Sequence, residues 1–208
     1  MAVKRKYSSA KREAQARETR RSILEAAHEL FVANGYAATT IKAIADRGGV
    51  AVQTVYAVFG SKRELLRQLI ESAITGDDEP LPITDRPEAR AVADEPDARR
   101  RAELDAALSR SITERVAPIV RVASEAAASD PELAAMMDVV KAARRKEMVG
   151  SAKILAGPDG SRVHDEAAAT LYVLYSPAVA DMLIGDYGWS AKRYEKWLAH
   201  MILAAVIE

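Results

Sequence analysis

The sequence has 208 residues, contains no cysteine and is 49% hydrophobic. A chain of this size and composition can bury the core of one larger domain, or of a small domain joined to a medium one. The lack of cysteine excludes disulfides, thiolate zinc sites and a cysteine nucleophile. No apolar run approaches the roughly 20 residues that span a bilayer, and the basic N-terminus has no apolar segment behind it. We therefore expect a cytoplasmic protein without a membrane span or a secretory signal.

The net charge is zero over the whole chain, but the charges are unevenly distributed. Residues 1–63 contain twelve Lys or Arg and five Asp or Glu, which gives them a net charge of +7 and leaves −7 for the rest. A basic head on an acidic body is expected when only the head meets a polyanion such as DNA. A solvated basic tail would produce the same asymmetry, so charge alone leaves both interpretations open.

The first third of the chain predicts an arm followed by four helices. Residues 1–16 are polar and basic, and we expect them to be flexible. Thr40 can cap the second helix, and Ser61 with Glu64 predicts a capping box at the start of the fourth. The expected helices run from near Arg17 to Asn34-Gly35, over residues 41–47, over residues 51–58 and from Ser61 to about Gly76.

Composition changes sharply at Gly76. Residues 77–97 are acidic and rich in proline, which indicates a connection between two domains, with one short helix over residues 86–94. Beyond it the pattern is helical to the end, without an internal repeat or a credible strand pair, so the predicted class is all-α. The expected helices cover residues 98–128 with a kink at Pro118, 131–155 with Asp130 as N-cap, 165–186 with a bend at Pro177, and the residues after Ser190, with a turn at Gly157-Pro158-Asp159-Gly160.

Two short helices around Gly48-Gly49 are typical of a helix-turn-helix. In that motif the second helix lies in the major groove of DNA, and its N-terminal side chains touch base edges. We expect Val55 and Phe59 to face the core, Gln53 to pair with an adenine edge and Val52 to meet a thymine methyl. The residues with the reach and the donors to hold phosphates are Thr40, Lys42, Thr54, Tyr56 and Lys62.

Residues 19–66 strongly resemble the DNA-binding domain of TetR-type repressors. A match at many fixed positions is a specific signal, and a three-helix packing unit without that function is the alternative. The resemblance implies a homodimer, double-stranded DNA with a palindromic operator, and a small-molecule effector of unknown identity. The matching positions are Asn34-Gly35-Tyr36, Thr39-Thr40, Ile44-Ala45, Gly49-Val50, Thr54-Val55-Tyr56, Phe59 and Ser61-Lys62-Glu64-Leu65.

Three positions depart from the family pattern. Position 51 usually holds a serine or threonine that caps the recognition helix, and Ala51, which we keep among the candidate DNA-binding residues, cannot provide that cap. Position 53 is often small, so Gln53 indicates a site preference particular to this chain. Position 58 is often a histidine or tyrosine near phosphate, a role that Val58 cannot take. These departures concern individual contacts rather than the family.

The resemblance and the composition together predict four parts. These are a flexible basic arm (residues 1–16), a TetR-type helix-turn-helix domain built on three helices (17–76), an acidic proline-rich connection (77–97) and a C-terminal helical bundle for ligand binding and dimerisation (98–208).

By the same resemblance, the last two helices form a four-helix bundle across the dimer axis. Small and apolar side chains there provide the surface that close helix packing requires, although the same stripe could pack only within the subunit. The candidate interface residues are Ala168, Leu171, Leu174, Ala178, Trp197 and Met201.

The walls of an effector pocket are less clearly marked. Large, adaptable or amphipathic side chains of the body are candidates, and plain core packing is the alternative for each. The sequence does not indicate the chemistry of the effector. The candidate residues are Met136, Met137, Tyr172, Tyr175, Met182 and Trp189.

No catalytic or metal-binding constellation is present in the sequence, and we expect neither an enzyme nor a cofactor. His28, His164 and His200 lie far apart, and His164-Asp165-Glu166 is better explained by acids at a helix start. Neither a phosphate-binding glycine loop nor a nucleophile elbow occurs. The favoured function is a ligand-responsive repressor. An activator, or an interaction protein whose basic head binds acidic partners or DNA non-specifically, is the alternative.

Overall fold

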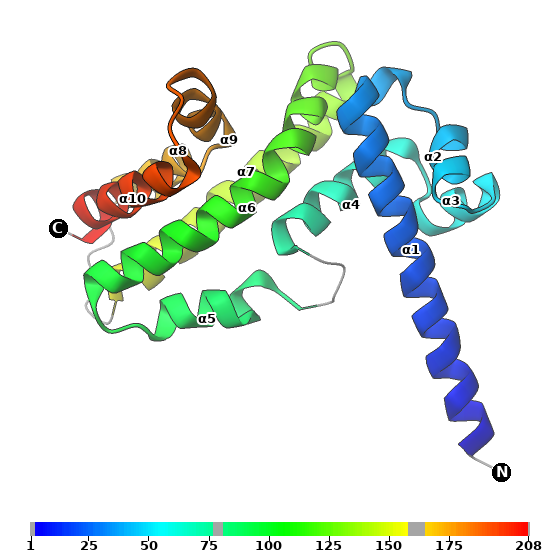
Figure 1. Ribbon diagram of the computed structural model, residues 1–208, viewed down its shortest axis with the longest axis horizontal. Coiled ribbons are helices and arrows are strands. Elements are labelled where there is room, and N and C mark those ends of the chain that lie inside the picture. The colour runs from blue at the N-terminus through cyan, green and yellow to red at the C-terminus, as the bar shows by residue number, and fades with distance from the viewer. Residues whose placement is uncertain (1–2, 77–80, 158–164, 208) are drawn as a thin grey trace.

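The computed structural model describes residues 3–76, 81–157 and 165–207, which form helices and the segments that join them. No strand occurs in these ranges, so the predicted all-α class is confirmed. A helix-turn-helix unit lies at one end, a long helical pair runs through the middle, and three helices cover the far end (Figure 1). Residues 77–80 of the connection, residues 158–160 of the predicted turn, and His164 lie outside the described ranges.

The N-terminal part contains α1 (Val3–Ala38), α2 (Ile41–Arg47), α3 (Val52–Phe59) and α4 (Lys62–Thr75). Helix α1 begins fourteen residues before the predicted start at Arg17, so most of the predicted flexible arm is helical. Gly35 interrupts the regular helix with φ +75°, a left-handed conformation that a glycine adopts without strain. The predicted stop is therefore present as a break inside α1.

Side-chain caps fix two of these helix starts. The Thr40 hydroxyl accepts a hydrogen bond from the Ala43 amide at 3.1 Å, and Ser61 accepts one from the Glu64 amide at 3.0 Å. Both caps were predicted. Glu64, however, does not return a bond to Ser61, because its carboxylate binds Arg67 and Gln68. Only half of the predicted capping box has formed.

The body contains a long hairpin, α6 (Ala98–Ala127) and α7 (Pro131–Ala156), with α5 (Pro87–Asp94) packed against α6. Asp130 caps α7, as predicted, by accepting from the amides of Glu132 and Leu133. The expected helix over residues 165–186 is divided into α8 (Asp165–Leu174), α9 (Pro177–Ala180) and a π-helical segment (Asp181–Asp186). Ser190 caps α10 (Ala191–Ile202), again as predicted.

Two hydrophobic cores hold the molecule together. The first contains buried residues of α1–α4 together with Ile119 of α6 and Leu133, Met136 and Met137 of α7. The second lies at the far end and is built around Leu171, Tyr194 and other residues of α6–α10. Because the first core crosses the proposed boundary at residues 77–97, the helix-turn-helix unit packs directly on the body.

One buried cation ties three elements of the body together. Arg101 of α6 donates from Nε to the Leu155 carbonyl at 2.9 Å and from Nη1 to the Glu95 carbonyl at 2.7 Å. These carbonyls lie at the end of α7 and directly after α5, where no further helical turn satisfies them. A charged donor is therefore retained in the interior because it satisfies backbone carbonyls that the helix ends leave without a helical partner.

Within the described residues, no single helix is long and apolar enough to cross a membrane. A bent pair, Glu166–Leu174 with Pro177–Asp186, reaches the necessary length and composition only in combination, with a bend of 53°.

Candidate nucleic-acid interface

A tight glycine turn joins α2 to α3. Ser22 of α1 donates from its hydroxyl to the Gly48 carbonyl at 2.7 Å, and a Cβ on Gly48 would lie only 3.2 Å from the Ile44 carbonyl oxygen. Gly49 follows with φ +67°, where a side chain would be strained. The turn thus lies close against α1, and this contact sets the angle at which α3 leaves it.

Helix α3 has one buried face and one open face. Val55 and Phe59 are buried in the first core, as predicted. Gln53 and Tyr56 are exposed, Tyr56 to 51%, and point away from that core. Val52 and Thr54 are half-buried, and Val52 packs partly on the core, which reduces the surface it can offer a base. Gln53 is the most accessible base-reading candidate on this helix.

The start of α3 has no side-chain cap. Ala51 occupies the N-cap position in extended conformation and makes no side-chain hydrogen bond. The Thr54 amide finds the Ala51 carbonyl at 2.9 Å, but no side-chain oxygen meets the first amides of the helix. Amides at a helix start, together with the helix dipole, favour an anion such as phosphate.

Two predicted phosphate-binding residues lie on or beside α2. Thr40 is exposed, although its hydroxyl already accepts the capping bond. Lys42 is paired with Asp46 one turn later, with 2.6 Å between Nζ and Oδ2, and its side chain is 76% exposed. An exposed pair of this kind contributes little to stability, so Lys42 can exchange Asp46 for a phosphate at small cost.

Lys62, a predicted phosphate-binding residue, is bonded to backbone carbonyls of its own chain. Its ammonium donates to the carbonyls of Tyr36 at 2.8 Å and of Thr39 at 2.9 Å, and lies 4.2 Å from the centre of the Tyr36 ring. Burial lowers the pKa of Lys62 below its usual value. Two of its three donors hold the end of α1 to the start of α4, so its contacts support the site from inside the protein.

Sequence reasoning missed Arg20, which fixes α3 and α4 to α1. Its guanidinium lies 5.1 Å from the centre of the Phe59 ring and donates to Gln68 Oε1 at 2.6 Å. In the sequence, Arg20 is a basic residue one turn before the apolar stripe of α1. That pattern does not indicate whether its side chain contacts protein or DNA.

The six candidate pocket residues do not gather around one cavity. Met136 and Met137 belong to the first core, beside the helix-turn-helix unit, whereas Tyr172 and Tyr175 pack against the second. Met182 is half exposed. The sixth, Trp189, lies edge-on to Trp197, with 6.1 Å between the ring centres.

The candidate interface residues divide between two environments. Leu171 and Leu174 of α8 are buried within their own subunit. Ala168, Trp197 and Met201 are partly buried against the same core, and Ala178 is exposed. The outward face of α8 instead presents Ala169, Val173 and their neighbours, with Val173 58% exposed. Among the residues that the structure describes, no group of three His, Asp or Glu side chains could hold a metal ion.

Residues 23–69 match the model of the family described as bacterial regulatory proteins, tetR family. Among curated proteins, the HTH-type transcriptional regulator TtgR of Pseudomonas putida is 41% identical over 58 residues, which are 28% of each chain. The HTH-type transcriptional regulator SrpR of Pseudomonas putida is 42% identical over 59 residues, again 28% of each chain. The chain thus aligns with about a quarter of the length of these relatives.

Solved structures resemble this fold over most of the chain. A TetR-family transcriptional regulator from Mesorhizobium loti matches with a TM-score of 0.66 and 18% identity, over 91% of this chain and 95% of that one. NalD, the secondary repressor of the MexAB-OprM multidrug efflux pump in Pseudomonas aeruginosa, matches with a TM-score of 0.64 and 19% identity, over 91% and 97%. Residues 23–69 are therefore similar to the tetR family of bacterial regulatory proteins, and the fold of the whole chain resembles the folds of these solved structures.

Proposed function

We propose that the chain binds a palindromic DNA operator as a homodimer and represses transcription until a small-molecule effector releases it. The observation that carries the DNA-binding part is α3, which has its apolar face locked in the core and its polar face open. A rigid scaffold that presents a short polar helix is what major-groove reading requires. The similarity to TtgR and SrpR, which are named as transcriptional regulators, supports the same function.

The contacts follow from the exposure of each side chain. Gln53 makes paired hydrogen bonds to an adenine, and the smaller exposed part of Val52 touches a thymine methyl. Residues at the start of α2 and on α3 bind phosphates, and these contacts fix the position of α3 in the groove. The phosphate-binding set comprises Thr40, Lys42, Thr54, Tyr56 and the amides that follow Ala51, with Lys62 as the residue that positions them.

Dimerisation places two copies of α3 on one side of the duplex. Two recognition helices must lie about 34–36 Å apart to enter successive major grooves, so a palindromic site follows from two-fold symmetry. An effector that favours a different spacing would weaken both half-sites together. The shared first core, which joins α4 to α6 and α7, supplies the mechanical connection that such a change requires.

Fluorescence anisotropy with genomic fragments, including the region upstream of the chain's own gene, tests the proposal across a salt series. We expect tight binding to one palindromic fragment. Gln53→Ala should change base preference, whereas Thr54→Ala and Lys42→Ala should weaken binding to all sequences. Lys42→Ala removes a charge and should also reduce the salt dependence. Lys146→Ala, an exposed cation on α7, is the matched control and should change neither.

Equal and weak binding to every fragment would refute sequence-specific regulation and favour a basic head that binds polyanions in general. Effector release is tested separately, by adding candidate ligands to the complex with the operator. If compounds that raise the melting temperature of the protein all leave the DNA bound, the release mechanism is wrong.

A further inference from the structure

Helix α1 extends well beyond the domain that it helps to build. Two residues anchor α1 beside α3: Arg20 contacts the Phe59 ring, and Ser22 donates to the Gly48 carbonyl. Residues 3–18, which we name the basic extension, continue from there as helix and run clear of the rest of the molecule (Figure 1). At 1.5 Å per residue, these sixteen residues reach about 24 Å.

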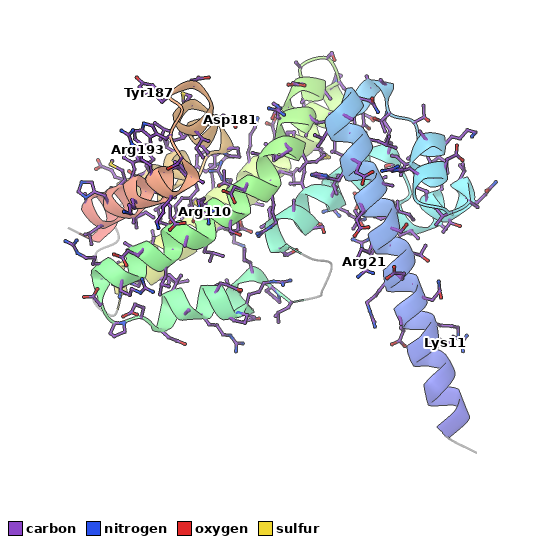
Figure 2. The ribbon with its side chains drawn as sticks, in the orientation of Figure 1. Lys11, Arg21, Arg110, Asp181, Tyr187 and Arg193 are labelled. Carbon is purple, nitrogen blue, oxygen red and sulfur yellow. The ribbon has the colours of Figure 1, made fainter. Side chains whose placement is uncertain are left out.

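The basic extension has no face suited to packing on protein. Every residue from Lys11 to Glu18 is exposed, and Lys11 lies far from any other element (Figure 2). By sequence it contains six Lys or Arg and two Glu, a net charge of +4, and no Leu, Ile, Phe or Met. A helix that is polar on all sides has no apolar stripe to bury, so its partner must be recognised by charge.

The place where the basic extension leaves the domain selects that partner. Ser22 contacts the turn before α3 and Arg20 lies over Phe59, the last residue of α3, so the basic extension leaves α1 alongside the helix whose N-terminal side chains make base contacts. A duplex held by α3 therefore passes close to this exit. DNA carries one negative charge per about 1.7 Å of axis, and a basic helix of this length can follow it beyond the half-site.

We propose that the basic extension binds the phosphate backbone of the DNA flanking the site read by α3, adding affinity that does not depend on sequence. This inference rests on the proposed function for the orientation of the duplex. In a homodimer the two basic extensions contact the two outer flanks, which lengthens the protected segment on each side.

The test uses the full chain and a variant in which Lys4, Arg5, Lys6, Lys11 and Arg12 are replaced by Gln, a residue that keeps helix propensity. The control variant replaces five exposed cations of the body by Gln, which removes the same charge: Arg99, Arg121, Arg145, Lys146 and Lys153. Affinity is measured by anisotropy on the operator without flanks, on the operator with twelve-base-pair flanks, and on a scrambled duplex of the longer length, each across a salt series.

We expect the flanks to increase the affinity of the unmodified chain and of the control variant but not that of the variant in the basic extension. If each basic extension makes two phosphate contacts, the salt slope of the dimer falls by about 3 to 4, and affinity near physiological salt falls on the order of tenfold to a hundredfold. The scrambled duplex should show the same loss. Equal losses in the two variants, or none in either, would overturn the inference. The proposed function fails on a different readout, namely no preference of the unmodified chain for operator over scrambled DNA.

Discussion

At the scale of single residues, the least expected group is Asp105, an acid buried in the middle of the body. Its carboxylate accepts a hydrogen bond from the Tyr175 hydroxyl, and burial raises its pKa from 3.8 to about 6 despite that bond. Burial likewise raises the pKa of Tyr175 well above its usual value. The pair joins α6 to the break between α8 and α9, which makes the polar contact part of the architecture.

Asp105 makes the stability of the protein depend on pH. Between about pH 4 and pH 6 the folded chain binds this proton and the unfolded chain does not, so the free energy of unfolding falls as pH rises through that window. Because the pKa rises from 3.8 to about 6, the free energy of unfolding falls by about 3 kcal/mol across the window. We expect Asp105→Asn to remove this fall, measured as the difference in urea unfolding free energy between variant and unmodified chain from pH 4 to pH 7.

Asp94→Asn, at an exposed position on α5, serves as the control and should leave the pH profile unchanged. Other carboxylates contribute to the profile of every variant, Glu64 among them with a pKa lowered to about 2 chiefly by Arg67, and cancel in the difference. A profile for Asp105→Asn parallel to that of the unmodified chain would show that the acid does not titrate in this window.

At the scale of elements, α3 has an identifiable defect, because Ala51 leaves the start of this helix without a side-chain cap. Ala51→Ser should supply an acceptor for the amide of Gln53 or Thr54 and raise the free energy of unfolding by about 1 kcal/mol. The control Ala57→Ser, in the same helix but exposed within it, should lower it by about 0.5 kcal/mol. Chemical denaturation of the unmodified chain and the two variants measures these changes in the free energy of unfolding. A lower free energy of unfolding for Ala51→Ser would mean that the cap does not form.

Helices and their starts could be predicted from the sequence because their causes are local. Thr40, Asp130 and Ser190 cap helices as expected, since a capping bond spans only two or three residues. The interruption after Leu174 was predicted two residues late, as a bend at Pro177 within a continuous helix. Tyr175 lies in this interruption and reaches Asp105, seventy residues away, a contact that no local pattern reveals.

In the candidate site, too, features with local causes could be predicted and features that depend on distant contacts could not. Burial of Val55 and Phe59 follows from helical periodicity and was correct, whereas the contacts of Lys62 depend on the carbonyls of a distant helix end. The predicted pocket residues do not surround one cavity, because Met136 lies in the first core and Tyr172 packs against the second. Side-chain type predicts that such residues are buried, but only the fold decides what they are buried against.

At the scale of the whole molecule, the helix-turn-helix unit and the body are joined by polar contacts as well as by the first core. Arg115 of α6 donates from Nε to the Ala73 carbonyl at 3.0 Å and from Nη2 to the Ile74 carbonyl at 3.2 Å, at the end of α4. Arg63 at the start of α4 pairs with Glu132 at the start of α7. Helix α4 is therefore held at both ends, and a shift of α6 against α7 has to move it.

The outward face of α8 bears on how two copies would meet in the proposed homodimer. Because Leu171 and Leu174 are buried within the subunit, a dimer built on this helix must use the opposite, outward face, where Ala169 and Val173 line a shallow groove with Glu166 and Thr170. An exposed valine beside small residues permits close approach of a second helix. Ala169 and Val173 are centred about 150° around α8 from Leu171 and Leu174, so the proposed interface lies on a face nearly opposite to the one predicted.

Val173→Lys should convert the proposed dimer to a monomer, because burying an ammonium in the interface costs free energy and the longer side chain prevents close approach of the second helix. Val139→Lys introduces the same charge at a valine of α7 that is 68% exposed and should leave the dimer intact. Light scattering after size exclusion gives the mass of each variant, and the monomer should lose operator affinity because its two half-sites are no longer bound together. If Val173→Lys remains dimeric, the copies do not meet through this face of α8, and a monomer from Val139→Lys would place the interface on α7.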